Sequence, residues 1–347
     1  MNIDTLGKVY QMLQDDYSRE IYENRVLFSL TNNDKYIDKL AYNIPPIQWL
    51  KHRLEKFPTK KVLLYGAGIR GKRISGLFPD MFTAFVDNDI NKQGITIDGL
   101  SVIPVSDIKK SYKDAVVVVS NKHGFMEIKN NLIDCGIKED RILNLGEKIN
   151  SYRDAQYFDL EKMKAEIDEV FVDCGAFNGD SAFAFMNWAD KVFKHIYCYE
   201  PDKKNYMECK NNLKNYIEKG NVSISNNGIW NSYSELNFSD TADVASHVCE
   251  DGIKKIEAVS LDDDLLIKRN EKVTFIKMDI EGAEMEALKG AKQIIKRQKP
   301  KLAICVYHKP EDIFEIPQYI MSLNPEYKFY LRHYTLSATD TILYAIP

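Results

Sequence analysis

Short apolar runs alternate with stretches of helical spacing along most of the chain. The apolar runs lie at residues 62–65, 83–86, 115–119, 142–143, 170–173, 196–200, 222–225, 273–279 and 301–307. Stretches with helical spacing lie between several of them, at residues 70–77, 124–135 and 283–296. Strands that alternate with helices favour a parallel sheet that is covered on both faces. The pattern therefore predicts an α/β protein with doubly wound sheets.

The two ends of the chain show other patterns. Near-helical spacing predicts a helical segment over residues 1–56, from Leu6, Val9, Leu13, Tyr17 and Ile21. Apolar residues at 328–332 and 341–345 predict a closing antiparallel hairpin. We therefore predict three parts: the helical segment at 1–56, a smaller α/β domain at 57–150 and a larger one at 151–347. The polar residues 231–256 are expected to form a loop over the carboxyl edge of the larger sheet, where ligands bind.

Composition narrows the classes of function. The formal net charge is −4, so nothing favours nucleic acid or an anionic membrane as a partner. No apolar run approaches the ~20 residues that a membrane span needs, and residues 1–7 lack the features of a signal peptide. The six cysteines are scattered without metal-ligand spacing. These features predict a reduced, cytoplasmic protein.

A glycine motif follows the first strand of the smaller domain. Gly66-Ala-Gly-Ile-Arg-Gly71 has the G-x-G-x-x-G spacing, and Asp87 ends the next strand 19 residues after Gly68. This separation is close to the ~20 residues of a dinucleotide fingerprint. Arg70, Lys72 and Arg73 favour a phosphate-bearing ligand. NAD, a nucleotide-sugar, or an empty Rossmann-like scaffold that serves packing all remain open.

The larger domain has a second glycine turn of opposite charge. The strand at 170–173 leads into Gly175 and Gly179, and the following strand ends on Glu200. A tight turn at one strand end and a carboxylate at the next are typical of a site for a ribose-containing ligand. The turn carries Asp173 and Asp180 but neither lysine nor arginine. A cationic cofactor such as S-adenosylmethionine (SAM) fits such a turn better than a pyrophosphate does.

The predicted cofactor site combines several kinds of contact. Glycines let the backbone approach a ligand, helix N–H groups bind a carboxylate, and an ionised acid accepts hydrogen bonds from a ribose diol. Residues after the third strand are candidates for packing on an adenine or for packing alone. The candidate residues are Asp173, Gly175, Ala176, Phe177, Asn178, Gly179, Asp180, Ser181, Glu200, Pro201, Gly228, Ile229, Trp230 and Asp279.

Acids and one histidine are expected at the same rim of the larger sheet. Asp279, Glu281 and Glu284 follow the fourth strand, and His308 follows the fifth. Carboxylates there could orient a hydroxyl group, stabilise a sulfonium or bind a divalent ion, although Glu281 and Glu284 also suit a helix N-terminus. A neutral imidazole near pH 7 is a candidate base for a sugar hydroxyl. We predict catalytic roles for His308, Asp279 and Glu281 and assign no metal site; a divalent metal is compatible but not favoured.

The larger domain resembles FkbM-type SAM-dependent methyltransferases over about residues 155–347. The resemblance rests on Val172-Asp-Cys-Gly-Ala-Phe-Asn-Gly-Asp-Ser181, Tyr199-Glu-Pro201, Val259-Ser-Leu-Asp-Asp263, Phe275-Ile-Lys-Met-Asp-Ile-Glu-Gly-Ala-Glu284 and Tyr307-His-Lys-Pro-Glu-Asp312. It implies O-methylation of a sugar or of a polyketide-type metabolite. Residues 85–88 and 97–104 are similar to Rossmann-like domains of enzymes of bacterial surface-polysaccharide synthesis. That similarity favours a sugar or glycan acceptor.

Two other classes of protein remain open. One is an NAD- or nucleotide-sugar-dependent sugar-modifying enzyme that acts from residues 57–150, although no Tyr-x-x-x-Lys pair follows the strands of that domain. The other is a non-enzymatic nucleotide-binding assembly protein, which leaves the acids at the second sheet unexplained. The sequence is also compatible with a homo-oligomer.

Overall fold

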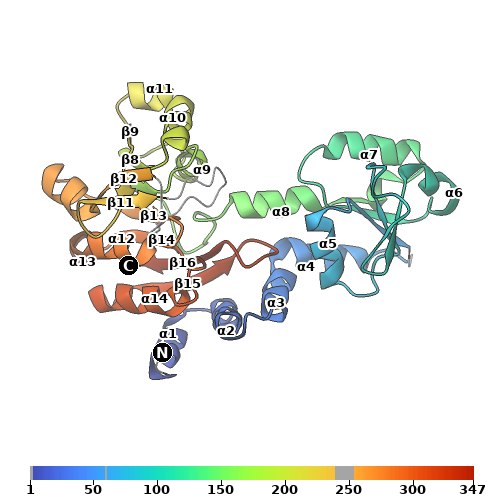
Figure 1. Ribbon diagram of the computed structural model, residues 1–347, viewed down its shortest axis with the longest axis horizontal. Helices are drawn as coiled ribbons and strands as arrows, with labels where there is room; N and C mark the ends of the chain where they lie inside the picture. The colour runs from blue at the N-terminus through green and yellow to red at the C-terminus, as the bar shows by residue number, and fades with distance from the viewer. Residues whose placement is uncertain (1–2, 59–60, 239–253) are drawn as a thin grey trace. The chain divides into compact units, whose positions relative to one another are not determined.

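A computed structural model describes residues 3–58, 61–238 and 254–347 (Figure 1). The chain forms two compact units. Unit 1 comprises Met1–Asn32, Ala155–His333 and Thr339–Pro347, and unit 2 comprises Asn33–Asp154 and Tyr334–Ala338. This division differs from the predicted boundaries, because the segment 1–56 is shared between the two units. Its first two helices contact elements of unit 1, whereas its last two contact helices of unit 2.

Four helices precede the first strand. They are α1 (Ile3–Met12), α2 (Asp16–Thr31), α3 (Lys35–Asn43) and α4 (Pro45–Leu54). Pro45 begins α4, since a proline needs no N–H partner in the first turn of a helix. Asp15 caps α2 by accepting a hydrogen bond from the backbone N–H of Ser18 at 2.7 Å. The segment is therefore helical, as its apolar spacing indicates.

Unit 2 contains a six-stranded sheet of order β3-β4-β2-β1-β5-β6. Its elements are β1 (Val62–Tyr65), α5 (Ile69–Leu77), β2 (Ala84–Val86), β3 (Thr96–Ile97), β4 (Leu100–Ile103), α6 (Ile108–Ser111), β5 (Val116–Val119), α7 (Phe125–Asp134), β6 (Ile142–Asn144) and α8 (Leu145–Asp154). All strands pair in parallel except β3, which is antiparallel to β4. The order of the five parallel strands is that of a doubly wound nucleotide-binding half.

The strands of unit 2 are buried on both faces. Leu64 and Val118 belong to one apolar cluster, while Leu63 and Val117 belong to the other. This burial explains why near-continuous valine runs were recognisable as strands. The short pair β3 and β4 buries only Ile97 and Val102, and it was not predicted because its few residues show no distinct pattern.

Unit 1 contains a seven-stranded sheet of order β15-β16-β14-β13-β7-β8-β9. Its elements are β7 (Val170–Cys174), α9 (Asp180–Trp188), β8 (His195–Tyr199), α10 (Lys203–Asn212), α11 (Lys214–Glu218), β9 (Val222–Ser225), β13 (Phe275–Met278), α12 (Glu284–Gly290), α13 (Lys292–Gln298), β14 (Lys301–Cys305), α14 (Asp312–Leu323), β15 (Lys328–His333) and β16 (Thr341–Ile346). Five strands are parallel, and β16 pairs antiparallel with both β14 and β15. The predicted parallel sheet with its closing hairpin is confirmed.

A second sheet in unit 1 includes both ends of the loop predicted at residues 231–256. Its order is β10-β12-β11, with β10 (Gly228–Ile229), β11 (Ser234–Phe238) and β12 (Lys254–Val259), and the π-helix η3 (Asp262–Lys268) follows. β11 and β12 pair antiparallel, so residues 234–238 and 254–256 lie in paired strands rather than in a loop. Residues 239–253 lie outside the described residues.

The register of the large sheet brings four strand ends to one edge. Cys174 at the end of β7 pairs with Tyr199 of β8 and with Met278 of β13, and Met278 pairs with Ile304 of β14. The residues that follow these strands therefore share that edge: Gly175, Glu200, Asp279 and Val306.

The helix α2 packs on the edge strand β15 of the same unit. Ser18 accepts a hydrogen bond from the backbone N–H of Leu331 at 2.9 Å, and Arg332 donates to Asp15 at 2.8 Å. These contacts join residues that are more than 300 positions apart in the sequence. In the described part of the chain, none of the helices has the length and hydropathy of a membrane-spanning segment.

Candidate active site

The turn after β7 is shaped by a close approach of two strand ends. Gly175 has φ 79°, and a Cβ atom there would lie 2.0 Å from the backbone oxygen of Asp279. The backbone N–H groups of Gly175 and Ala176 both donate to the oxygen of Tyr199, at 3.0 and 3.1 Å. Glycine is therefore required at position 175, where the turn leans against the end of β13.

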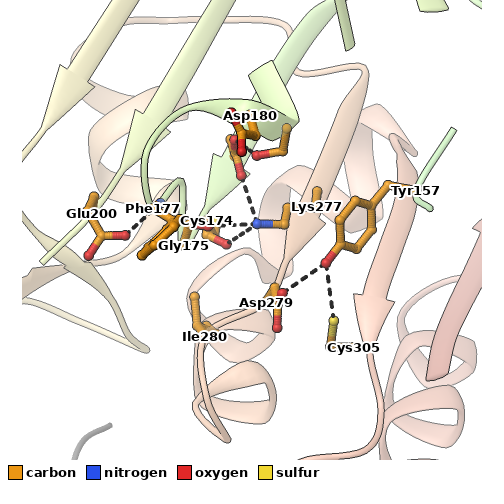
Figure 2. Close-up of polar contacts among 12 residues, drawn as sticks. Tyr157, Cys174, Gly175, Phe177, Asp180, Glu200, Lys277, Asp279, Ile280 and Cys305 are labelled. Carbon is orange, nitrogen blue, oxygen red and sulfur yellow. Dashed lines mark hydrogen bonds and ion pairs between the residues drawn. The ribbon is translucent and has the colours of Figure 1, made fainter. Parts of the chain in front are cut away.

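Glu200 holds this turn from the neighbouring strand end. Its side chain accepts a hydrogen bond from the backbone N–H of Phe177 at 2.8 Å (Figure 2) and another from that of Asp202 at 2.9 Å. Only 6% of Glu200 is exposed, and this burial raises its pKa to about 7 although both N–H groups oppose the shift. Glu200 thus lies at the carboxyl end of β8, and its contact with a ribose stays a prediction.

A buried lysine neutralises the acid of the turn. Lys277 Nζ lies 3.0 Å from Asp173 Oδ1 and donates to the backbone oxygen of Gly175 at 2.7 Å. Burial alone would lower the pKa of Lys277, but the carboxylates of Asp173 and Asp279 raise it. Ser181 also donates to Asp173. Asp173 therefore serves an internal ion pair, and the turn is less acidic than its sequence indicates.

Asp279 is held by two tyrosines. Tyr157 donates to Oδ2 at 2.9 Å (Figure 2), and Tyr307 donates to Oδ1 at 3.3 Å. Burial opposes ionisation, but Lys277 and His308 outweigh it and keep the pKa of Asp279 below its ordinary value. Asp279 is thus a fixed, ionised carboxylate at the centre of the site.

His308 lies among three carboxylates. Its Nδ1 is 2.9 Å from Glu284 Oε1, and its Nε2 is 3.5 Å from Asp279 Oδ1 and 3.4 Å from Glu281 Oε2. Burial lowers the pKa of the imidazole, but these acids raise it to about 9. The three acids that face the ring therefore favour the protonated imidazole, in contrast to the neutral imidazole that was expected near pH 7.

The other predicted turn residues lie at the start of α9. Ala176 is buried, while Asp180 is exposed and accepts a hydrogen bond from Asn178 at 3.0 Å. Gly179 precedes the first residue of α9 with φ 92°. The N-terminus of α9 therefore follows directly on the turn, as a carboxylate-binding helix end requires.

The predicted adenine contacts belong to the smaller sheet. Gly228 and Ile229 form β10 and are buried, and the backbone N–H of Trp230 donates to Val259 at 3.0 Å. Asn226 instead reaches Glu200 and donates to its backbone oxygen at 2.8 Å and to that of Pro201 at 3.0 Å. Contact of Ile229 or Trp230 with an adenine stays a prediction.

Two residues of the site, Tyr157 and Lys277, were not predicted from the sequence. Tyr157 lies before β7 in no regular element, 122 positions from Asp279. Lys277 lies in the motif at residues 275–284. Its charge within the otherwise apolar strand β13 was the one feature of the sequence that could have indicated a role in the site.

The glycine turn of unit 2 has internal partners. A Cβ at Gly71 would lie 1.8 Å from the backbone oxygen of Gly66, so this glycine serves packing. The backbone N–H of Ala67 donates to Asp87 at 2.8 Å, and Arg70 donates to the oxygen of Gly146 at 3.3 Å. These internal contacts are compatible with a Rossmann-like scaffold that serves packing. Binding of a nucleotide-sugar at Gly66–Gly71 stays a prediction.

Comparison with known proteins gives two family matches along the chain. Residues 173–331 match the model described as methyltransferase FkbM domain, and residues 58–143 match the model described as C2185-like, N-terminal. No curated protein sequence is significantly similar to the chain.

Solved structures of methyltransferases resemble the chain. Methyltransferase FkbM from Methylobacillus flagellatus KT is 21% identical with a TM-score of 0.50, over 91% of this chain and 100% of that chain. An rRNA methylase from Streptococcus thermophilus is 12% identical with a TM-score of 0.34, over 58% and 93% of the two chains. Fibrillarin from Aeropyrum pernix, in complex with natively bound SAM, is 12% identical with a TM-score of 0.37, over 57% and 76%.

The family match and the fold agree on the larger sheet. Residues 173–331 include the glycine turn, Glu200 and the cluster around His308. The first of these structures shares the fold over nearly the whole chain. The predicted resemblance to FkbM-type methyltransferases is therefore confirmed for residues 173–331, and the larger sheet has the fold of SAM-dependent methyltransferases.

Proposed function

We propose that the protein transfers the methyl group of SAM to a hydroxyl oxygen of a sugar. The observation that carries this proposal is Glu200, a buried carboxylate at the end of β8 beside the turn that follows β7. In a doubly wound sheet this is the position from which an acid binds a ribose diol. SAM supplies an electrophilic methyl group on a sulfonium, which suits a site with several carboxylates.

Each part of the binding site has a separate task. Glu200 accepts hydrogen bonds from the ribose, and the N–H groups at the start of α9 bind the carboxylate of the methionine moiety. Asp279, at the end of the adjacent strand β13, faces the positive charge. The backbone of the turn is fixed by Lys277, which donates to Gly175 at 2.7 Å. The binding groups are therefore held in place before the cofactor arrives.

The carboxylates at the end of β13 suit a hydroxyl acceptor. In the reaction an oxygen–carbon bond forms while the carbon–sulfur bond breaks, and the hydroxyl loses its proton. We assign the proton to the pair Asp279 and Glu281, because His308 is already engaged by three acids. A sugar hydroxyl is a poor acid, so positioned proton removal contributes substantially to the rate.

The choice of a sugar rests on two supports. Carboxylates accept hydrogen bonds from neighbouring hydroxyl groups, which only polyhydroxylated acceptors supply in numbers. The N-terminal motifs at residues 85–88 and 97–104 are similar to those of enzymes of bacterial surface-polysaccharide synthesis. We therefore place the reaction in the synthesis of a surface glycan or a related metabolite.

Replacing Glu200 by glutamine tests the cofactor assignment. The change keeps the shape but removes the charge, so SAM binding should weaken by about 1.5–3 kcal/mol, or about 10- to 150-fold in Kd. Titration calorimetry of the full chain measures this directly. The matched control is Glu208→Gln on the exposed face of α10, which should bind SAM like the wild type. Equal affinity in both variants would reject the role of Glu200.

The pH dependence of SAM binding gives an independent test of Glu200. Burial raises its pKa to about 7, so the carboxylate form that accepts the ribose hydroxyls prevails only above that pH. About a tenth of these groups are ionised at pH 6 and about nine tenths at pH 8, so affinity should rise about tenfold over this range. The rise should be absent in Glu200→Gln. If the affinity of Glu200→Gln for SAM rose equally between pH 6 and pH 8, the pH dependence would come from another titrating group.

A further inference from the structure

The imidazole of His308 has acids at both of its nitrogen atoms. Nδ1 lies 2.9 Å from Glu284 Oε1, which is a hydrogen-bonding distance. Nε2 lies 3.5 Å from Asp279 Oδ1 and 3.4 Å from Glu281 Oε2, and it has no hydrogen-bond partner among the residues that the structure describes. The side chain of His308 is only 8% exposed. A buried nitrogen therefore points at two carboxylates without bonding to either.

The separations around Nε2 fit two ligands of one ion. Donor atoms that each lie ~2.1 Å from a tetrahedral metal are ~3.4 Å apart. The distances from Nε2 to Asp279 and to Glu281 are 3.5 and 3.4 Å. In addition, one donor atom from each of Asp279, Glu284 and His308 lies within 4.8 Å of the other two. Asp279 and His308 thus converge closely enough to share a cation, and Glu281 adjoins them 3.4 Å from Nε2.

Neighbouring side chains orient the donors toward a common space. Glu284, which is fully buried, lies 2.9 Å from Nδ1, so Nε2 is the nitrogen that faces Asp279 and Glu281. Tyr157 donates to Asp279 Oδ2, whereas Oδ1 accepts a longer hydrogen bond from Tyr307 at 3.3 Å and lies 3.5 Å from His308 Nε2. At protein metal sites, the histidine nitrogen that does not bind the metal usually faces a carboxylate or a backbone carbonyl. The second oxygen of the Glu284 carboxylate, Oε2, has no hydrogen-bond partner in the described part of the chain.

The local charge also favours a cation. Three carboxylates surround His308, so even a protonated imidazole leaves an excess of negative charge, and Lys277 already forms an ion pair with Asp173 at 3.0 Å. Buried carboxylates need compensation by a partner charge or a metal. An ion at Nε2 would supply two positive charges in the centre of the cluster.

We propose that His308, Asp279 and Glu281 bind a first-row divalent cation such as Mn²⁺ or Zn²⁺, and that Glu284 orients His308. An imidazole nitrogen with two carboxylates suits these ions, whereas Ca²⁺ takes six to eight oxygen ligands. Three protein ligands leave a coordination position open. The role of that position rests on the proposed function: the acceptor hydroxyl would bind there, and the ion would promote loss of its proton.

The test is metal binding by the full chain. The protein is treated with EDTA, desalted and titrated with MnCl₂ or ZnCl₂ by calorimetry, and bound Mn²⁺ is counted by electron paramagnetic resonance. We expect one ion per chain. Affinity should fall at least about tenfold in His308→Asn and Glu281→Gln, and about 10- to 100-fold in Glu284→Gln. The matched controls are His195→Asn, at the start of β8, and Glu286→Gln on α12, which should bind like the wild type.

Each outcome decides the proposal. Absence of binding by the wild type overturns it, and so does unchanged affinity in both His308→Asn and Glu281→Gln. Glu281 is partly exposed, so its variant should fold even if the His308 variant does not; thermal midpoints verify this. SAM affinity is measured on the same samples. If the wild-type protein binds SAM but no metal, the metal proposal is rejected and the proposed function stands. If it binds metal but not SAM, the proposed function is rejected and the metal site stands.

Discussion

Replacing Asp279 by asparagine should lower kcat about 10²–10⁴-fold, the usual contribution of a positioned proton-transfer group. Asp279 is fixed by Tyr157 and Tyr307 at the end of β13, beside His308. Asparagine preserves its shape but neither takes up a proton nor opposes a sulfonium charge. The measurement is the rate of S-adenosylhomocysteine formation with sugar acceptors at saturating SAM.

A second carboxylate–tyrosine pair provides the control for Asp279. Glu271 accepts a hydrogen bond from Tyr197 at 3.0 Å, and it precedes β13 rather than following it. Glu271→Gln should therefore retain wild-type kcat. If Asp279→Asn kept the wild-type kcat and thermal midpoint, Asp279 would have no role in the methyl transfer, and the reacting groups would have to be sought elsewhere than at the end of β13.

Replacing Lys277 by methionine should destabilise the fold by about 3–5 kcal/mol, the cost of leaving one member of a buried ion pair without its partner. Lys277 and Asp173 have side chains that are 3% and 0% exposed, with 3.0 Å between Nζ and Oδ1. The variant leaves the carboxylate of Asp173 uncompensated. Urea unfolding, followed by circular dichroism, measures the change.

A second buried ion pair, at the opposite edge of the sheet, provides the control that separates the effect of Lys277 on stability from its effect on SAM binding. Lys301, at the start of β14, lies 2.6 Å from Glu169 and is also buried. Lys301→Met should lose comparable stability but bind SAM normally, whereas Lys277→Met should also weaken SAM binding, since Gly175 loses its donor. A loss below about 1 kcal/mol for Lys277→Met would contradict the stabilising role of its ion pair.

Much of the fold was predictable because its signals are local. A run such as residues 115–119 is apolar throughout, which identifies a strand that is buried on both faces. The positions of Glu200 and Asp279 followed from a general rule that places ligands at the carboxyl ends of parallel strands. The short strands β3 and β4 lacked such a signal.

The remaining features of the site depend on contacts between distant residues. Nothing near Tyr157 in the sequence indicates that its hydroxyl reaches Asp279. The charge of His308 depends on how many acids surround it, and only the folded chain brings Asp279, Glu281 and Glu284 to one ring. Residue types were therefore predictable, whereas protonation was not.

The packing of α2 on β15 has a consequence for folding during synthesis. Ser18 and Leu331 are 313 positions apart, and most of unit 2 lies between them in the chain. At ~5–20 residues per second the ribosome completes β15 roughly 15–60 s after α2. During this interval the apolar residues of α2 that later contact unit 1 lack their partner strand, whereas every strand of unit 2 has already been made. We therefore expect unit 2 to fold first and the methyltransferase sheet to close only near the end of translation.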